Sequence, residues 1–143
     1  MAEIDPAMMR RAIALARERV GRTGPNPAVG CVIALDGEII AEAATAPGGR
    51  PHAEEQALAA AGPRATGATV YVTLEPCGER RSGAASCAER LTEPGVARVV
   101  VACADPSPYA AGRGLERLRA AGVPVETGLL ADEAAALYAA YKP

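Results

Sequence analysis

The chain has 143 residues, half of them apolar, which is enough to bury one sizeable core without disulfides. Its net charge is −2, whereas proteins that bind nucleic acid through phosphates usually carry a basic excess. There is no Phe or Trp and there are only four Tyr, which argues against a platform for base stacking. We therefore expect a small-molecule ligand and not a nucleic acid.

Membrane insertion and secretion find no support in the sequence. The N-terminal segment lacks the apolar core of a signal peptide, and no run of 18 consecutive apolar residues occurs. We expect a cytoplasmic protein that does not enter a membrane. In that reducing compartment the four cysteines are expected to serve metal binding or catalysis and not disulfides.

The first predicted elements are a helix and a β-hairpin. Asp5 followed by Pro6 predicts a helix with Asp5 as its N-cap. An apolar stripe then runs to a stop at Gly21 and consists of Met9, Ala12, Ile13, Ala16 and Val20. After a loop over residues 21–27, strands over 28–35 and 38–41 are joined by the turn Asp36–Gly37, which is a strong hairpin signal.

The rest of the chain alternates between strands and helices. The segment 52–61 is rich in Ala, Glu and Gln and predicts a helix that begins at His52. Strands are expected over 69–74, 96–102 and 123–126, and helices around 87–92, 115–121 and 130–141. This alternation predicts an α/β layered sheet. No linker or repeat divides the chain, so residues 1–143 are expected to form a single domain.

Three residues have the types and spacing of a catalytic zinc site. His52, the only histidine, stands at the predicted helix start, Cys77 follows Pro76 after a strand, and Cys87 comes ten residues later. In zinc deaminases an H-x-E segment and a Pro-Cys…Cys segment supply one imidazole and two thiolates. Three protein ligands leave a fourth position for water. We therefore predict that His52, Cys77 and Cys87 bind Zn²⁺.

Glu54 completes the H-x-E segment and is the candidate catalytic residue. A carboxylate beside the metal-bound water can accept its proton and pass protons to the substrate, and it must not itself be a ligand. Either motif alone is more often structural, but here both occur in the required order. The other two cysteines, Cys31 and Cys103, lie in apolar strand segments and are expected to behave as small buried hydrophobes.

At these residues the sequence resembles the cytidine-deaminase-like superfamily, and within it the pyrimidine deaminase domain of bifunctional riboflavin-biosynthesis proteins. The resemblance extends nearly from end to end, through the segments 21–30, 48–54, 67–77, 97–106 and 120–128. It implies a three-layer α/β/α fold around a central five-stranded mixed sheet. It also implies hydrolytic deamination of a diamino-ribosylamino-pyrimidinone 5′-phosphate with release of ammonia, and assembly as a homodimer or larger oligomer.

The resemblance also assigns substrate contacts. Asn26 matches a family asparagine that contacts the substrate ring, although an Asn between two prolines is also a good turn former. The charged run between the two cysteines includes Arg80 and Arg81, which either lie in a solvated loop or contact a substrate phosphate.

The sequence departs from the family in the loop between the cysteines. Relatives commonly read Cys-(Ser/Ala)-His-x-Gly-(Lys/Arg)-Thr-Pro-Pro-Cys, so the second cysteine is nine positions after the first and not ten as here. The loop His and Thr-Pro-Pro are missing, so Arg80 or Arg81 replaces the basic residue only by analogy. Thr45 stands where many relatives have His, and the C-terminal reductase of the family does not follow Pro143. The chain is thus expected to be a stand-alone deaminase or an excised domain.

Two other readings remain open. The altered 78–86 loop is compatible with a deaminase of another base, nucleoside or nucleotide, or of a tRNA adenosine. The last of these would require a basic surface that the composition does not indicate. Alternatively, the domain is a zinc-stabilised module that has lost catalysis, against which the presence of Glu54 speaks.

Overall fold

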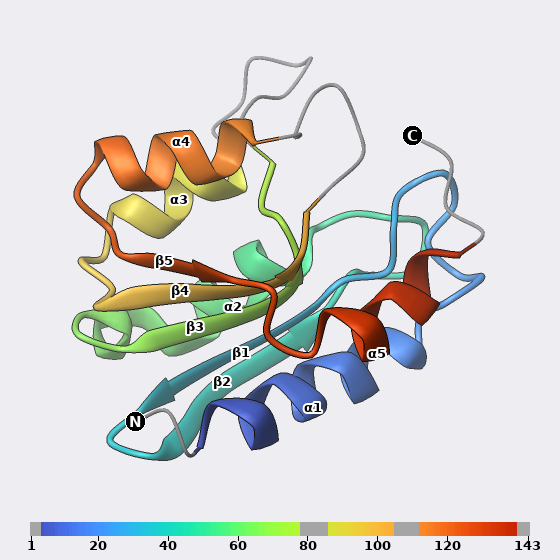
Figure 1. The fold of residues 1–143 in the computed structure, drawn as a ribbon, viewed down its shortest axis with the longest axis horizontal. Coiled ribbons are helices and arrows are strands. Elements are labelled where there is room, and N and C mark those ends of the chain that lie inside the picture. The colour runs from blue at the N-terminus through green and yellow to red at the C-terminus, as the bar shows by residue number, and fades with distance from the viewer. Residues whose placement is uncertain (1–3, 78–85, 105–111, 140–143) are drawn as a thin grey trace.

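The computed structural model describes residues 4–77, 86–104 and 112–139 and is built on one five-stranded mixed sheet (Figure 1). The strand order is β2-β1-β3-β4-β5. The bounds are β1 Gly30–Leu35, β2 Glu38–Ala44, β3 Thr69–Leu74, β4 Arg98–Cys103 and β5 Val125–Thr127. Strand β1 is antiparallel to β2 and β3, whereas β3, β4 and β5 are parallel. The predicted five-stranded mixed sheet is confirmed.

Helices cover both faces of the sheet and make three layers (Figure 1). Helices α1 (Asp5–Arg17) and α5 (Ala131–Ala135) and the 3₁₀ helix η2 (Ala136–Tyr138) pack on one face. Helices α2 (Ala53–Ala61), α3 (Cys87–Thr92) and α4 (Arg113–Ala120) pack on the other, and the 3₁₀ helix η1 (Gly62–Ala65) follows α2. The three-layer α/β/α fold is therefore also confirmed. No helix in the described part of the chain has the length and apolar character needed to cross a bilayer.

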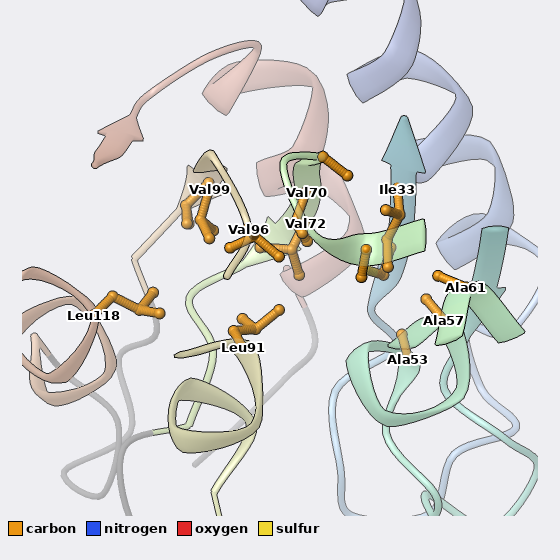
Figure 2. Packing of buried hydrophobic residues seen from close by; sticks show 14 of the residues in the cluster. Ile33, Ala53, Ala57, Ala61, Val70, Val72, Leu91, Val96, Val99 and Leu118 are labelled. Atoms are coloured by element: carbon orange, nitrogen blue, oxygen red, sulfur yellow. The ribbon is translucent and has the colours of Figure 1, made fainter. Parts of the chain in front are cut away.

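The core on the α2 side depends on small residues in the helix and branched residues in the strands. Ala53 and Ala57 are fully buried one turn apart and lie near Ile33 of β1 (Figure 2). Alanine favours a helix and lets its backbone approach the sheet closely. Leu91 of α3 and Leu118 of α4 fill the space over the other strands (Figure 2). The α2–α4 layer therefore rests directly on the sheet.

Strand directions bring three loops to one edge of the sheet. Because β1 is antiparallel to β3, with Cys31 opposite Val72, β1 begins where β3 ends. Strand β2 ends there too, since Ala44 pairs with Gly30. The loops over residues 21–29, 45–52 and 75–77 therefore leave the sheet at the same edge, although they are far apart in the sequence.

The turn of the predicted hairpin is confirmed. Asp36 has φ 51° and Gly37 has φ 82°. Two consecutive positive φ values are typical of the type I′ turn, which matches the twist of a β-hairpin. The second strand is longer than predicted, because it continues to Ala44. Its pairing with β1 shifts register between Ile33 and Ala34.

Two expectations about the first helix are wrong. Asp5 is not the N-cap: it is the first helical residue, its side chain caps nothing, and its carboxylate accepts hydrogen bonds from Arg98 and Tyr71 instead. Val20 is not part of the buried stripe, because the helix ends at Arg17 and the Val20 side chain is 49% exposed.

The last predicted helix, over residues 130–141, is shorter than expected. Among the described residues α5 ends at Ala135 and a 3₁₀ turn continues to Tyr138. The Tyr138 hydroxyl pairs with the Thr73 hydroxyl at 2.7 Å, a contact that ties this segment to the end of β3.

Candidate metal centre

Three separate elements bring His52, Cys77 and Cys87 together at the convergent edge of the sheet. His52 is the extended residue just before α2, Cys77 follows the end of β3, and Cys87 is the first residue of α3. Each offers one ligand atom, and all three atoms lie within 4.8 Å of one another. The structure thus brings together the three residues predicted as metal ligands.

The distances and donor types fit a tetrahedral zinc ion. His52 Nδ1 lies 3.3 Å from Cys87 Sγ. A tetrahedral ion with nitrogen and sulfur ligands at about 2.0–2.3 Å separates its ligand atoms by about 3.5 Å. One imidazole and two thiolates are also donors that bind zinc in preference to magnesium or calcium. Three protein ligands would leave the fourth position open.

The start of α3 is arranged to favour the thiolate of Cys77. The Ser86 hydroxyl accepts from the backbone N–H of Glu89 at 3.1 Å and so caps the helix. The backbone N–H of Cys87 donates to Cys77 Sγ at 3.3 Å, and that of Ala88 donates to the Cys77 carbonyl at 3.1 Å. Hydrogen bonds from backbone N–H groups stabilise a thiolate. The predicted helix start at Cys87 is confirmed.

Glu54 lies in the first turn of α2, beside this cluster, and is buried, with 4% of its surface exposed. Burial raises the pKa of its carboxyl group to about 7, while the nearby charge of His52 and a hydrogen bond with the Cys87 side chain act in the opposite direction. A cation held by the cluster would likewise favour the ionised carboxylate. Glu54 is thus a buried carboxyl group close to the metal ligands but outside the ligand set.

Asn26 reaches the same edge of the sheet from the first loop. Its side-chain Nδ2 donates to the carbonyl of Gly49 at 3.0 Å, and its own carbonyl accepts from the Thr23 hydroxyl at 2.6 Å. Gly49 has φ 101°, and a Cβ there would lie 2.6 Å from Asn26 Nδ2. Within the described part of the chain, no hydrogen bond reaches the amide oxygen of Asn26. The loop over residues 23–26 is therefore fixed to the loop that precedes His52.

Thr45 has a role that sequence reasoning missed. It is 1% exposed, its hydroxyl accepts from the backbone N–H of Val29 at 2.9 Å, and its own N–H donates to the Val29 carbonyl. On the other side, the Thr73 hydroxyl accepts from Gly30 N–H at 3.0 Å. Two threonines thus hold the segment that follows Asn26. No sequence signal indicates this role, because the partners are 16 and 43 residues apart.

With this geometry established, the comparisons with known proteins identify the family. The family model for the cytidine and deoxycytidylate deaminase zinc-binding region matches residues 2–103. The chain belongs to this family. The match includes the whole cluster of His52, Cys77 and Cys87 together with Glu54, so zinc is the metal that these ligands serve.

Riboflavin-biosynthesis proteins are among the proteins that the chain resembles. The riboflavin biosynthesis protein RibD of Escherichia coli is 50% identical over 130 residues, which are 91% of this chain and 35% of that protein. Acinetobacter baumannii RibD is 45% identical and superposes with a TM-score of 0.91 over 99% of this chain and 39% of that one. A Thermotoga maritima diaminohydroxyphosphoribosylaminopyrimidine deaminase/5-amino-6-(5-phosphoribosylamino)uracil reductase is 39% identical, with a TM-score of 0.87 over 94% of this chain and 39% of that one. The chain thus spans 35–39% of the length of these relatives.

The remaining candidate residues divide into two groups. Cys31 and Cys103 lie in β1 and β4 and are not part of the metal cluster, and burial raises the pKa of both thiols. All four cysteines are thiols and not disulfides. Arg80 and Arg81, predicted as phosphate contacts, lie outside the described residues.

Proposed function

We propose that residues 1–143 form a single zinc-dependent deaminase domain that hydrolyses a C–N bond of a cyclic amidine. The substrate that we infer is the diamino-ribosylamino-pyrimidinone 5′-phosphate of riboflavin biosynthesis. The observation that carries this proposal is the cluster of His52, Cys77 and Cys87 beside the buried Glu54. The identity of 50% with Escherichia coli RibD supports the choice of substrate.

The proposed chemistry assigns each residue one task. His52, Cys77 and Cys87 would hold zinc, which when bound would supply a water activated as a nucleophile near neutral pH. Glu54 accepts one proton of the attacking water and passes it to the ring nitrogen. It then takes the remaining proton from the hydroxyl group on the ring carbon and passes it to the departing amine. The new C–O bond replaces the exocyclic C–N bond, and ammonia leaves. The burial of Glu54 keeps its carboxyl group out of competing contact with bulk water.

Substrate binding is assigned to residues around the metal cluster. Asn26 is held by Gly49 through its Nδ2, and we propose that it orients the pyrimidine ring through its amide group. Arg80 or Arg81 would contact the 5′-phosphate, since a guanidinium pairs well with phosphate oxygens. Thr45 takes no part in binding, because its hydroxyl is buried against Val29.

The test is ammonia release by zinc-loaded protein, with Glu54→Gln as the active-site variant. We expect Glu54→Gln to retain zinc and to lose about 10²–10⁴-fold in rate, because the proton transfers lose their acid and base. Glu55→Gln is the matched control, since it makes the same chemical change one residue further along α2, in a groove on the outer side of the helix. Equal rates in the wild type and Glu54→Gln would overturn the assignment of Glu54.

A panel of substrates separates the alternatives. The lengthened loop between Cys77 and Cys87 favours, as the second candidate, a deaminase for another base, nucleoside or nucleotide. Deamination of such a compound, without activity on the riboflavin intermediate, would replace the substrate and keep the reaction. Zinc binding without activity on any amine would instead indicate an inactive zinc-stabilised module.

Assembly and location complete the proposal. We propose a homodimer or larger oligomer, as the resemblance to the deaminase family implies. A sedimentation mass equal to one chain would contradict the oligomer. A cytoplasmic location is supported by the four cysteines, all of which are thiols.

A further inference from the structure

Helix α4 lies directly against the peptide that carries one metal ligand. Gly114, the second residue of α4, is buried, and a Cβ built on it would lie 1.8 Å from the carbonyl oxygen of Pro76 and 3.7 Å from the carbonyl carbon of Cys77. Real Cβ atoms essentially never approach other heavy atoms closer than 3.0 Å. Glycine is therefore the residue that permits α4 to rest on the backbone at Pro76 and Cys77.

Helical preference does not explain a glycine at this position. Glycine is the least favourable residue in a helix interior apart from proline, and alanine is the most favourable. Gly114 also does not adopt a positive φ, unlike Gly112 just before the helix, whose φ is 77°. The contact with Pro76, and not the conformation of the backbone, accounts for Gly114.

The helix cannot easily move away from this contact. Leu118, one turn further along α4, is fully buried and points into the core between α4 and the strands (Figure 2). Helix α4 also packs against α3, which begins with the ligand Cys87. A side chain added at residue 114 would therefore push on Pro76 as much as on the helix.

The ligand peptide is held from its other sides as well. The backbone N–H of Glu75 donates to the Cys103 carbonyl at 2.8 Å, and the Cys77 carbonyl accepts from Ala88 at 3.1 Å. Strand β4, helix α3 and helix α4 thus enclose the segment 75–77 together. Helix α4 meets this segment through the close contact of Gly114 with Pro76.

We propose that Gly114 is a positioning residue of the zinc site: it lets α4 form a stop behind Pro76 that fixes Cys77 Sγ relative to His52 and Cys87. The inference rests on the zinc site of the proposed function and is independent of the substrate. Metal ligands must lie within about 0.2 Å of their required distances. The added Cβ of an alanine would displace backbone by more than that, because the contact must open from 1.8 Å to 3.0 Å.

The experiment measures zinc affinity of the full chain by competition with a chromophoric chelator, together with the visible spectrum of the Co²⁺-loaded protein. The test variant is Gly114→Ala. The matched control is Gly30→Ala, because a Cβ at Gly30 would also lie 1.8 Å from a backbone oxygen, that of Ala12 in α1, on the face of the sheet away from the metal ligands. Both variants insert one methyl group into an equally tight backbone contact.

We expect Gly114→Ala to weaken zinc binding by at least about tenfold, the lower limit for losing a residue that supports a metal ligand. The Co²⁺ spectrum should change as the sulfur ligand moves. Gly30→Ala should lower the melting temperature but leave zinc affinity and the spectrum as in the wild type. Unchanged zinc affinity in Gly114→Ala, or equal losses in both variants, would overturn the proposal.

A second pair of variants applies if Gly114→Ala does not fold. Leu118→Ala loosens the anchor of α4 without inserting an atom, and Leu137→Ala is the matched truncation in the core on the α1 side. We expect weaker zinc binding in Leu118→Ala alone, and wild-type affinity in both would overturn the proposal. Because zinc binding is measured without substrate, a protein that binds zinc but releases no ammonia would refute the proposed function and leave this inference standing.

Discussion

Two polar clusters of this protein, one on the α1 side of the sheet and one at the edge where the loops converge, satisfy their charges in different ways. On the α1 side, Arg98 donates to both carboxylate oxygens of Asp5 at 2.6 and 3.0 Å, and the Tyr71 hydroxyl donates to the same carboxylate at 2.5 Å. At the metal centre, His52, Cys77 and Cys87 direct one nitrogen and two sulfur atoms at a common point. The first cluster is complete within the protein, whereas the second has the donor set of a metal site.

The same contrast is visible in the two buried carboxyl groups. Burial alone raises the pKa of Asp5, but hydrogen bonds from Arg98 and Tyr71 outweigh it and the net pKa is lowered. For Glu54 burial dominates and the pKa rises to about 7. A carboxylate with a fixed guanidinium partner contributes to stability, whereas one without such a partner is suited to proton transfer. Substitutions in each cluster should therefore have different consequences.

The largest effect is expected at the metal centre. Cys87→Ala should abolish equimolar zinc binding and reduce activity by more than about 100-fold, since loss of a residue that merely supports a ligand already costs 10–100-fold. Zinc content by mass spectrometry and ammonia release measure both effects. Cys103→Ala is the matched control, because Cys103 is a thiol outside the cluster. Equal zinc loss in the two variants would contradict the assigned ligand set.

The next largest effect is expected in the cluster of Asp5, Tyr71 and Arg98. Arg98→Met should lower the free energy of unfolding by about 3 kcal/mol, because it leaves the Asp5 carboxylate buried without its cation. The side chains of Arg98 and Asp5 are only 19% and 9% exposed. Urea unfolding of the zinc-free protein measures the change. The double variant Asp5→Leu with Arg98→Met should recover part of the loss, and a double variant less stable than the sum of both single changes would contradict this explanation.

The lowered pKa of Asp5 predicts a pH dependence of stability. A group whose pKa is lower in the folded than in the unfolded state adds stability above its unfolded pKa of about 3.9, and this stability is lost as pH falls through the folded pKa. The urea midpoint of zinc-free wild type should therefore fall more steeply below about pH 4 than that of Asp5→Asn. Parallel curves for the two proteins would show that Asp5 does not titrate differently on folding.

The smallest effect is expected at an exposed ion pair. Arg11 donates two hydrogen bonds to Glu42 at 2.7 and 2.9 Å, a geometry as good as that of Arg98, but the side chains are 46% and 33% exposed. Water and salt screen such pairs, so Arg11→Ala should leave the melting temperature nearly unchanged. A loss of stability as large as that in Arg98→Met would show that hydrogen-bond geometry, and not burial, accounts for the stabilising effect of the Asp5–Arg98 ion pair.

Local patterns in the sequence were sufficient for most elements and for the metal ligands. The Asp36–Gly37 turn was predictable because its backbone requires two positive φ values that few residues accept. The ligands His52, Cys77 and Cys87 were predictable because zinc favours these residue types and because the H-x-E and Pro-Cys…Cys segments occur in the order found in zinc deaminases. The turn depends on adjacent residues, and each ligand is recognisable from its own short motif, although the fold brings His52 and Cys87 together from 35 residues apart.

The tertiary structure decided what depends on partners distant in the sequence. Asp5 follows every local rule for an N-cap, yet Arg98, 93 residues away, binds its carboxylate and makes it part of a buried ion pair. The hydrogen bond between Thr45 and Val29 and the contact between Gly114 and Pro76 exist only because strands and helices pack together. The reason is physical: a hydrogen bond or a close backbone contact is set by distance in space, and sequence patterns report only neighbours along the chain.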